Sequence, residues 1–429
     1  MNSALDFLSF SDPNVQYVVL GTILMGASAA VIGTFAFLRK RALVGDAIAH
    51  SVLPGICLAF MLSGTRSLYV LLPGAFVTGW LSLLLIDLIA GKTRIKADAA
   101  IGLVLSIFFG VGILLLTSIQ RSGNASQAGL DHFLFGKAAA IVPSDIWLFG
   151  GVAVLLIGTV ILFFKDFKLL SFDPDFAQTS GLPVRFLELL LSTLTVMAVV
   201  TGIQAVGVVL MAALLITPAA AARYWTDKLW LMIIIGALFA SLSGFFGSWI
   251  SYENSRMPTG PWIIVILSLF AFASMIVAPN RGWITRQRLL RNYRKKIIDE
   301  NILKAFYKAG EQKGNFDVAM DKNSISEIRD FDDSQLQSAF NRLLKKNLLK
   351  TESSSGYQLT QKGREEGTRL VRLHRLWELY LTQVMRIQAD HVHDDAEAVE
   401  HLLTPEMEAE LEEALGYPEF DPHQKLIPR

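Results

Sequence analysis

Apolar residues are distributed unevenly along the chain and divide it into two halves. Residues 15 to about 280 contain a series of apolar runs, and each run is close to the ~20 residues that a helix needs to cross a bilayer. From about residue 281 onward the sequence is polar and charged, with no run long enough to span. The pattern predicts an all-α polytopic membrane domain followed by a soluble domain.

The predicted number of membrane spans is eight or nine. Apolar segments begin near residues 15, 45, 67, 98, 144, 186, 207, 229 and 260. Gly202, Gln204 and Gly207 interrupt the long stretch 184–224, which is therefore either two crossings or one crossing with a re-entrant piece. The N-terminal segment has no basic n-region and no small-residue cleavage site, so the first apolar run is expected to remain as a span.

Basic residues predict the orientation of these spans. They follow the first, third, fifth and last spans, within 39–41, 92–96, 165–168 and 281–296. Because cytoplasmic loops carry an excess of Lys and Arg, we expect the N-terminus outside and the C-terminal domain in the cytoplasm. This orientation favours an odd number of crossings.

Composition adds two exclusions. The single cysteine, Cys57, lies in an apolar segment, so no intramolecular disulfide can form. The tripeptide Gly91-Lys92-Thr93 resembles the end of a phosphate-binding loop, but the first glycine of that motif would fall at Ile86, inside an apolar helix. The energy for any active transport is therefore expected to come from another chain.

An acid and a histidine stand four residues apart at the start of the second apolar segment. Asp46 and His50 would share one face of a helix, where carboxylate and imidazole can hold one ion. Ionisable groups inside a membrane segment are costly and mark pathways for ions or protons. The alternative is an interfacial helix cap at Asp46 and a packed polar side chain at His50. We interpret the pair as ligands of a transported metal.

A second acid–imidazole pair, Asp131 and His132, falls in a loop predicted to lie outside. The simpler interpretation is two surface residues, and the alternative is a ligand on the way into the transport pathway.

The longest basic loop, after the fifth span, predicts a short cytoplasmic helix. Its central segment, SFDPDFAQTSGL, has a helix-start signal at Asp173 and a glycine stop at Gly181. In a transporter such a helix could receive the movement of a motor subunit. The alternative is an ordinary surface loop.

The soluble half predicts a winged-helix layout. One helix is expected over ILKAFYKAGEQKG and a helix–turn–helix over SISEIRDF and DDSQLQSAFNRLLKKNLL. KTESSSGYQLT predicts two short strands around a Ser-Gly turn, and a long helix follows from about residue 360. Residues 297–429 contain 25 acidic and 17 basic residues, which gives a net charge of −8 with neutral histidines. Asp332 and Asp333 open the expected recognition helix. DNA is therefore not an expected partner, because nucleic-acid binding depends largely on positive charge.

The membrane half resembles the permeases of ABC transporters for manganese, zinc and iron. The resemblance rests on LRKRALVGDAIAHSVLPGICLAF, the LFG of DHFLFGK, SFDPDFAQTSGL and VGVVLMAALLITPAAAARYW. It implies a cytoplasmic ABC ATPase, an extracytoplasmic metal-binding protein, and a second permease copy or a sister permease in a bacterial plasma (inner) membrane. It also implies that Asp46 and His50 are the pathway ligands. The ATPase-docking helix would contain Asp173, Pro174, Asp175, Phe176 and Gly181.

The tail resembles the iron- and manganese-dependent repressors of the diphtheria-toxin-repressor family, on HRLWELYL, HVHDDAEAVEHLLTPEMEAELEEALG and YPEFDPHQKLIP. The metal ligands that this resemblance implies are His374, Glu378, His393, Glu397, Glu400 and His401. Glu397 stands where some iron-responsive members carry cysteine, which favours manganese. Asn301 and Lys304 depart from the family, because they occupy the positions of an acidic pair. A lysine there would repel a metal ion.

The sequence therefore predicts the membrane permease of an ATP-driven importer of divalent transition metal, manganese first and zinc or iron next, without enzymatic activity of its own. The same metal is a candidate regulatory ligand of the tail. We expect a transmembrane permease domain at 1–280, a basic cytoplasmic linker at 281–294, a winged-helix-like domain at 295–360 and a helical metal-sensing or dimerisation domain at 361–429. The alternative function is a membrane-tethered or released metal-dependent transcriptional repressor.

Overall fold

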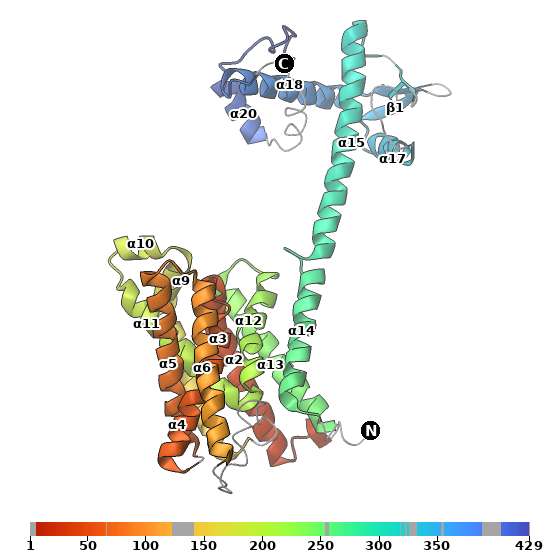
Figure 1. The fold of residues 1–429 in the computed structure, drawn as a ribbon. Helices are drawn as coiled ribbons and strands as arrows, with labels where there is room; N and C mark the ends of the chain where they lie inside the picture. Colours follow the sequence, from red (N-terminus) through yellow and green to blue (C-terminus); the bar gives the residue numbers. More distant parts are fainter. Residues whose placement is uncertain are drawn as a thin grey trace. The chain divides into compact units, whose positions relative to one another are not determined.

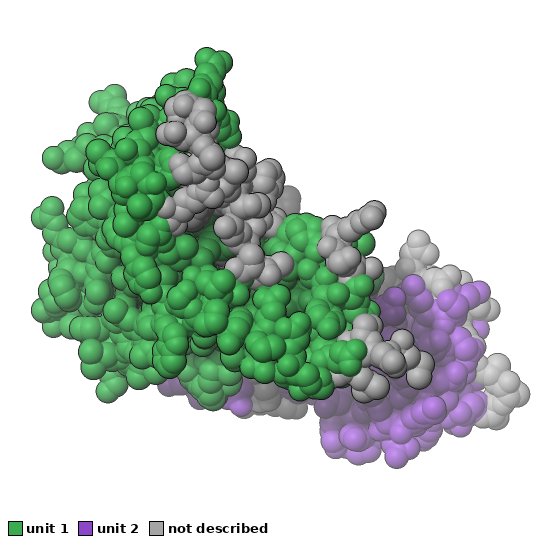
Figure 2. Space-filling view, turned by 90° about the horizontal axis from the view of Figure 1, so that it is seen from below, with its two compact units in different colours: residues 1–285 green, residues 286–429 purple. Residues whose placement is uncertain are grey.

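A computed structural model describes residues 6–428, apart from 66, 122–140, 254–256, 318, 322–323, 326–332, 353–355 and 388–404. The chain forms two compact units, Met1–Thr285 and Arg286–Arg429 (Figure 2). Unit 1 is entirely helical in its described part, and unit 2 adds a single hairpin (Figure 1). These features confirm the predicted fold class.

Unit 1 is a bundle of apolar helices built around α2. Eight of its helical segments are long and apolar enough to cross a membrane, within the predicted count of eight or nine. Helix α2 is the most enclosed of them and packs against α8, α11, α12 and α13. The helices are α2 (Pro13–Leu38), α3 (Val44–Ser51), α4 (Leu53–Ser63), α5 (Leu68–Lys92), α6 (Ala97–Arg121), α8 (Pro143–Leu162), α9 (Phe164–Phe172), α10 (Pro174–Thr179), α11 (Val184–Val206), α12 (Val208–Arg223), α13 (Leu229–Glu253) and α14 (Thr259–Val277).

The ambiguous stretch 184–224 divides at one glycine. Gly207 has φ +89°, a backbone conformation that other residues rarely adopt, and it separates α11 from α12. Helix α11 is long enough to span, whereas α12 has 16 residues and a length of about 24 Å. The phosphate-loop-like Gly91-Lys92-Thr93 lies at the C-terminal end of α5, as expected for a turn that leaves the membrane.

Small residues allow α2 to lie close to its neighbours. A Cβ atom at Gly33 would be 1.8 Å from the carbonyl oxygen of Leu215 on α12. A Cβ at Gly26 would be 3.2 Å from the carbonyl oxygen of Ala240 on α13. In lipid, where helices do not gain by hiding apolar surface from water, such close backbone approach is a main source of packing energy.

Unit 2 has the elements that the sequence predicts. They are α15 (Trp283–Lys313), α17 (Asp333–Lys345), β1 (Leu349–Glu352), β2 (Gly356–Leu359), α18 (Gln361–Gln383) and α20 (Pro405–Ala414). The two strands pair antiparallel with Leu349 opposite Leu359, which forms the predicted wing. Much of the first helix predicted within SISEIRDF lies outside the described residues. Most of the stretch predicted as a basic linker is helical, because α15 begins at Trp283.

Buried ion pairs connect the helices of unit 2. Asp299 of α15 accepts hydrogen bonds from Arg342 and Lys346, at the end of α17 and just beyond it. Glu408 of α20 pairs with Arg369 and Arg372 of α18. The charges that give this domain its acidic balance are therefore partly used to hold the helices together.

Candidate transport and sensor sites

The first predicted site lies on α3, a helix of eight residues inside the bundle. The Nε2 atom of His50 is 3.5 Å from Oδ1 of Asp46, and both side chains are partly exposed. Helix α3 packs against α5, α6, α11 and α12. Gly45 keeps it close to α12, because a Cβ there would lie 2.7 Å from Cδ2 of Leu215. The i, i+4 spacing thus brings the carboxylate and the imidazole together as expected.

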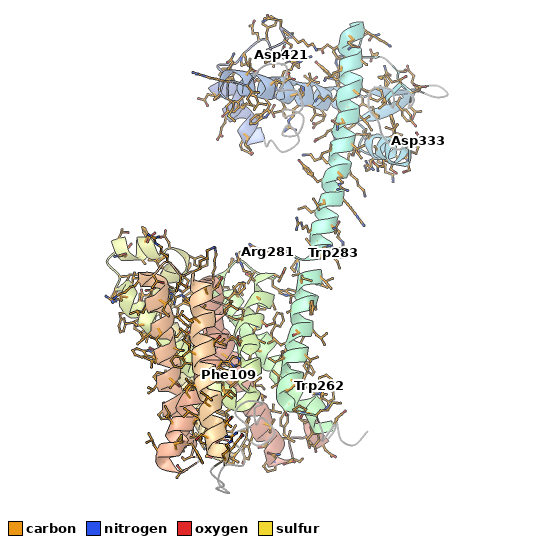
Figure 3. All side chains as sticks on the ribbon, viewed as in Figure 1. Phe109, Trp262, Arg281, Trp283, Asp333 and Asp421 are labelled. Atoms are coloured by element: carbon orange, nitrogen blue, oxygen red, sulfur yellow. The ribbon has the colours of Figure 1, made fainter. Side chains whose placement is uncertain are left out.

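Phe109 limits the orientation of the His50 imidazole. Its ring, midway along α6 (Figure 3), lies 4.9 Å from the imidazole and nearly perpendicular to it. The Nδ1 atom of His50 is buried and has no hydrogen-bond partner within the described part of the chain. A buried polar atom without a partner costs free energy. The sequence gives no signal for this contact, because Phe109 is an ordinary apolar residue 59 positions away.

Asp46 and His50 are two side chains, fewer than a metal site usually needs. Among the described residues there is no cluster of three or more His, Cys, Asp or Glu side chains that could hold a metal. Asp131 and His132 lie outside the described residues, so the prediction of a second pathway site stays a prediction. Transition metals usually take four to six ligands, which is more than these two side chains supply.

A short helix is present at the predicted place as α10, Pro174–Thr179. The carboxylate of Asp173 caps it by accepting a hydrogen bond from the backbone N–H of Phe176 at 2.9 Å. Gly181, with φ +83°, follows its end. The ring of Phe176 is 57% exposed, and the ring of Phe172 at the end of α9 is 55% exposed. These two exposed aromatic rings offer an apolar contact for another protein.

The second predicted site lies in unit 2, between α15 and α18. His374 and Glu378 are buried on α18, with Nε2 of His374 at 3.1 Å from Oε1 of Glu378. Lys304 of α15 is also buried, and its Nζ lies 3.0 Å from Nδ1 of His374. The other four predicted ligands, His393, Glu397, Glu400 and His401, lie outside the described residues.

The described residues of this corner place a basic side chain against a predicted metal ligand. A metal ligand histidine must offer a nitrogen lone pair, and the ammonium of Lys304 is hydrogen-bonded at Nδ1. Asn301, the other departure from the family pattern, is buried, and its Oδ1 has no hydrogen-bond partner in the described structure. The sequence identified Lys304 as repulsive to metal, but did not predict that it binds His374.

A basic cavity of about 310 Å³ lies between α15 and the expected recognition helix α17. Arg291, Arg294 and Lys295 of α15 face Ser334 and Ser338 of α17 across it. The side of α17 that carries these serines is therefore lined by the preceding helix of the same chain.

Comparisons with known proteins agree with both halves. Residues 11–278 match the ABC 3 transport family, and residues 360–429 match the iron dependent repressor, metal binding and dimerisation domain. The manganese transport system membrane protein MntC of Bacillus subtilis is 44% identical over 381 residues, 89% of this chain and 87% of that protein. The zinc transport system membrane protein TroC of Treponema pallidum is 42% identical, over 68% of this chain and 97% of its own length.

A solved structure shows the same membrane fold. PsaBC from Streptococcus pneumoniae, in complex with Fab, superposes with a TM-score of 0.59 and 33% identity, over 66% of this chain and 99% of that chain. An apolar bundle with eight segments long enough to cross a membrane, together with these relatives, defines a membrane transport subunit. The chain belongs to the ABC 3 transport family.

Proposed function

We propose that this chain is the permease of an ATP-driven importer of divalent transition metal, with manganese as the first candidate and zinc or iron next. The observation that carries the proposal is the Asp46–His50 pair on a helix packed inside the bundle. Hard oxygen and imidazole nitrogen together suit these metals and do not select one of them. The names of the relatives, for manganese and for zinc, favour the same class of substrate.

The importer requires partners that the chain does not contain. A separate ABC ATPase supplies the energy and docks on α10, where Phe176 is exposed beside the capped turn. An extracytoplasmic metal-binding protein delivers the ion. A second permease copy or a sister permease completes the pathway, because Asp46 and His50 alone do not fill a coordination shell.

The orientation has the N-terminus outside and the tail in the cytoplasm. This orientation requires an odd number of crossings. The described residues contain eight long apolar segments, and α12 would be the ninth. Arg223 at the end of α12 and Lys228 just beyond it are consistent with a cytoplasmic end there. The tail then regulates transport or joins two permease subunits.

Uptake of radioactive manganese by cells tests the pathway. Replacing Asp46 or His50 with Ala should abolish uptake while the protein still accumulates in the membrane, because each change removes one of the two ligands. Asp98→Ala is the matched control, since Asp98 is an exposed acid in the first turn of α6. Normal uptake by both single variants would remove the pathway assignment.

The alternative function, a tethered or released repressor, has its own test. A gel-shift experiment with the released tail at low salt should show no retarded DNA, because the domain carries a net charge of −8.

A further inference from the structure

The buried corner between α15 and α18 holds a chain of three polar side chains. Lys304 contacts His374 through Nζ and Nδ1 at 3.0 Å, and His374 contacts Glu378 through Nε2 and Oε1 at 3.1 Å. Lys304 is 5% exposed, and His374 and Glu378 are each 3% exposed. Lysine and glutamate are rarely buried this deeply unless they have partners, so these contacts account for the burial of both side chains.

With Lys304 and Glu378 in their ordinary charged forms, these two contacts fit one arrangement of donors and acceptors. An ammonium group can only donate, so Nδ1 of His374 accepts from Lys304. The Nε2–H then donates to the carboxylate of Glu378, which can only accept when it is ionised. A positive end and a negative end are thus joined through a neutral imidazole, and both ring nitrogens are used.

While Lys304 donates to Nδ1, this use of both nitrogens leaves His374 no lone pair for a metal. Coordination needs a lone pair on the imidazole, and the only lone pair of His374 accepts the hydrogen bond from Lys304. A divalent ion close to Nδ1 would also lie beside the ammonium and be repelled by it. The ion can bind His374 only after Lys304 is displaced from a buried position.

We propose that the ammonium of Lys304 takes the place of a regulatory metal ion in this corner. The cation that joins α15 to α18 is then part of the chain and cannot dissociate. The tail keeps its helices together at any cytoplasmic metal concentration, and His374 and Glu378 serve as partners of Lys304 in the wild-type protein. This inference rests on the proposed role of the tail but not on metal transport through Asp46 and His50.

Manganese binding by the full-length protein in lipid nanodiscs tests the inference. Asp46→Ala and His50→Ala are introduced together first, so that binding in the pathway does not contribute. Manganese binding is measured by electron paramagnetic resonance of the free ion. In this background, His374→Gln should leave the binding unchanged. Lys304→Glu should raise the affinity at least tenfold, and the gain should be lost when His374→Gln is added. Lys313→Glu, at the exposed end of α15, should have no such effect.

Loss of manganese binding on His374→Gln in the protein that retains Lys304 would overturn the proposal. A second measurement covers the case in which Lys304→Glu fails to fold. The protease resistance of the tail in the parent protein should be the same with and without a metal chelator, and Lys304→Met should reduce it at least severalfold. A tail that becomes protease-sensitive when the chelator is added would show that an ion, rather than Lys304, joins the helices. Since neither measurement involves transport, a failure here leaves the uptake test of Asp46 and His50 intact.

Discussion

At the scale of single residues, the transport pair depends on where α3 is held. The imidazole of His50 lies between the carboxylate of Asp46 and the ring of Phe109. Gly33 and Gly45 both allow backbone or side-chain contact with Leu215 of α12. The position of the Asp46–His50 pair therefore depends on glycines that have no chemical role themselves.

Gly33→Ala tests this dependence. The added methyl group would overlap the carbonyl oxygen of Leu215 at 1.8 Å, so α2 and α12 must move apart. Overpacking of this kind costs about 1–3 kcal/mol or more, and we expect a lower unfolding temperature in detergent and reduced uptake. Gly102→Ala is the control, because a Cβ on Gly102 meets no atom within 4 Å. Equal stability of the two variants would contradict the close approach.

A buried arginine, Arg375, is the basis of a second prediction for single residues. It is 4% exposed on α18 and donates to Glu311 of α15 and to the carbonyl oxygen of Leu426. Burial alone lowers the pKa of its guanidinium, but the hydrogen bonds and charge of Glu311 outweigh this effect and raise the pKa above its ordinary value. The group therefore stays charged in the folded state at any working pH.

Arg375→Met should destabilise unit 2 by about 3–5 kcal/mol, because it leaves the buried carboxylate of Asp421 without its opposite charge. Thermal unfolding followed by protease sensitivity of the tail measures the loss. Arg386→Met is the control, since that side chain is exposed after the end of α18. A tail as resistant as the wild type would show that the pair adds nothing.

At the scale of elements, lipid and water impose different rules, and this difference decides what sequence can predict. A membrane helix must satisfy its own backbone and be apolar for ~20 residues, so nearly every span is visible as a run of letters. The wing and the capped helix α10 are equally local, because Gly, Ser and Asp specify turns and caps through their own backbone.

The contacts that decide function are not local in this way. His50 and Phe109 come from different helices, and Lys304 and His374 are 70 residues apart. Their meeting depends on how whole helices pack, which no single segment specifies. The sequence could therefore predict which residues are chemically unusual, but not that Lys304 would become the partner of a predicted ligand.

Phe176 gives a prediction for α10. Replacing its exposed ring with Asp should weaken ATPase binding at least tenfold, because a charge would replace the apolar contact that we propose for docking. The amount of ATPase that co-purifies with the permease measures this effect, together with ATP hydrolysis in nanodiscs. The control is Phe272→Ala on α14, which removes a ring that is similarly exposed (61%) but lies outside α10. Aspartate is not used at this position, because a charge on a membrane helix would itself be disruptive. Unchanged co-purification in Phe176→Asp would place the docking surface elsewhere.

At the scale of the whole molecule, one chain combines a transport unit with a unit that resembles a regulator. Deleting residues 295–429 should change the initial rate of manganese uptake, because we propose that the tail regulates transport or joins two permease subunits. The initial rate of uptake is measured in cells preloaded with increasing manganese. Lys304→Met in the full chain provides the comparison, since it weakens one corner and leaves the rest of the tail present. Identical initial rates in the truncated and complete proteins would contradict both roles.

Cys57 is the single thiol of the chain, and it is fully buried in α4 with its sulfur 3.9 Å from the carbonyl oxygen of Gly112. Maleimide reagents need an accessible thiolate, so the native protein should remain unlabelled. Any cysteine introduced at an exposed site can then be modified selectively without first altering the wild-type sequence. One label at Ser180 beside α10 and another at Lys313 would make the two units a spectroscopic pair, and their separation could be followed while manganese is added.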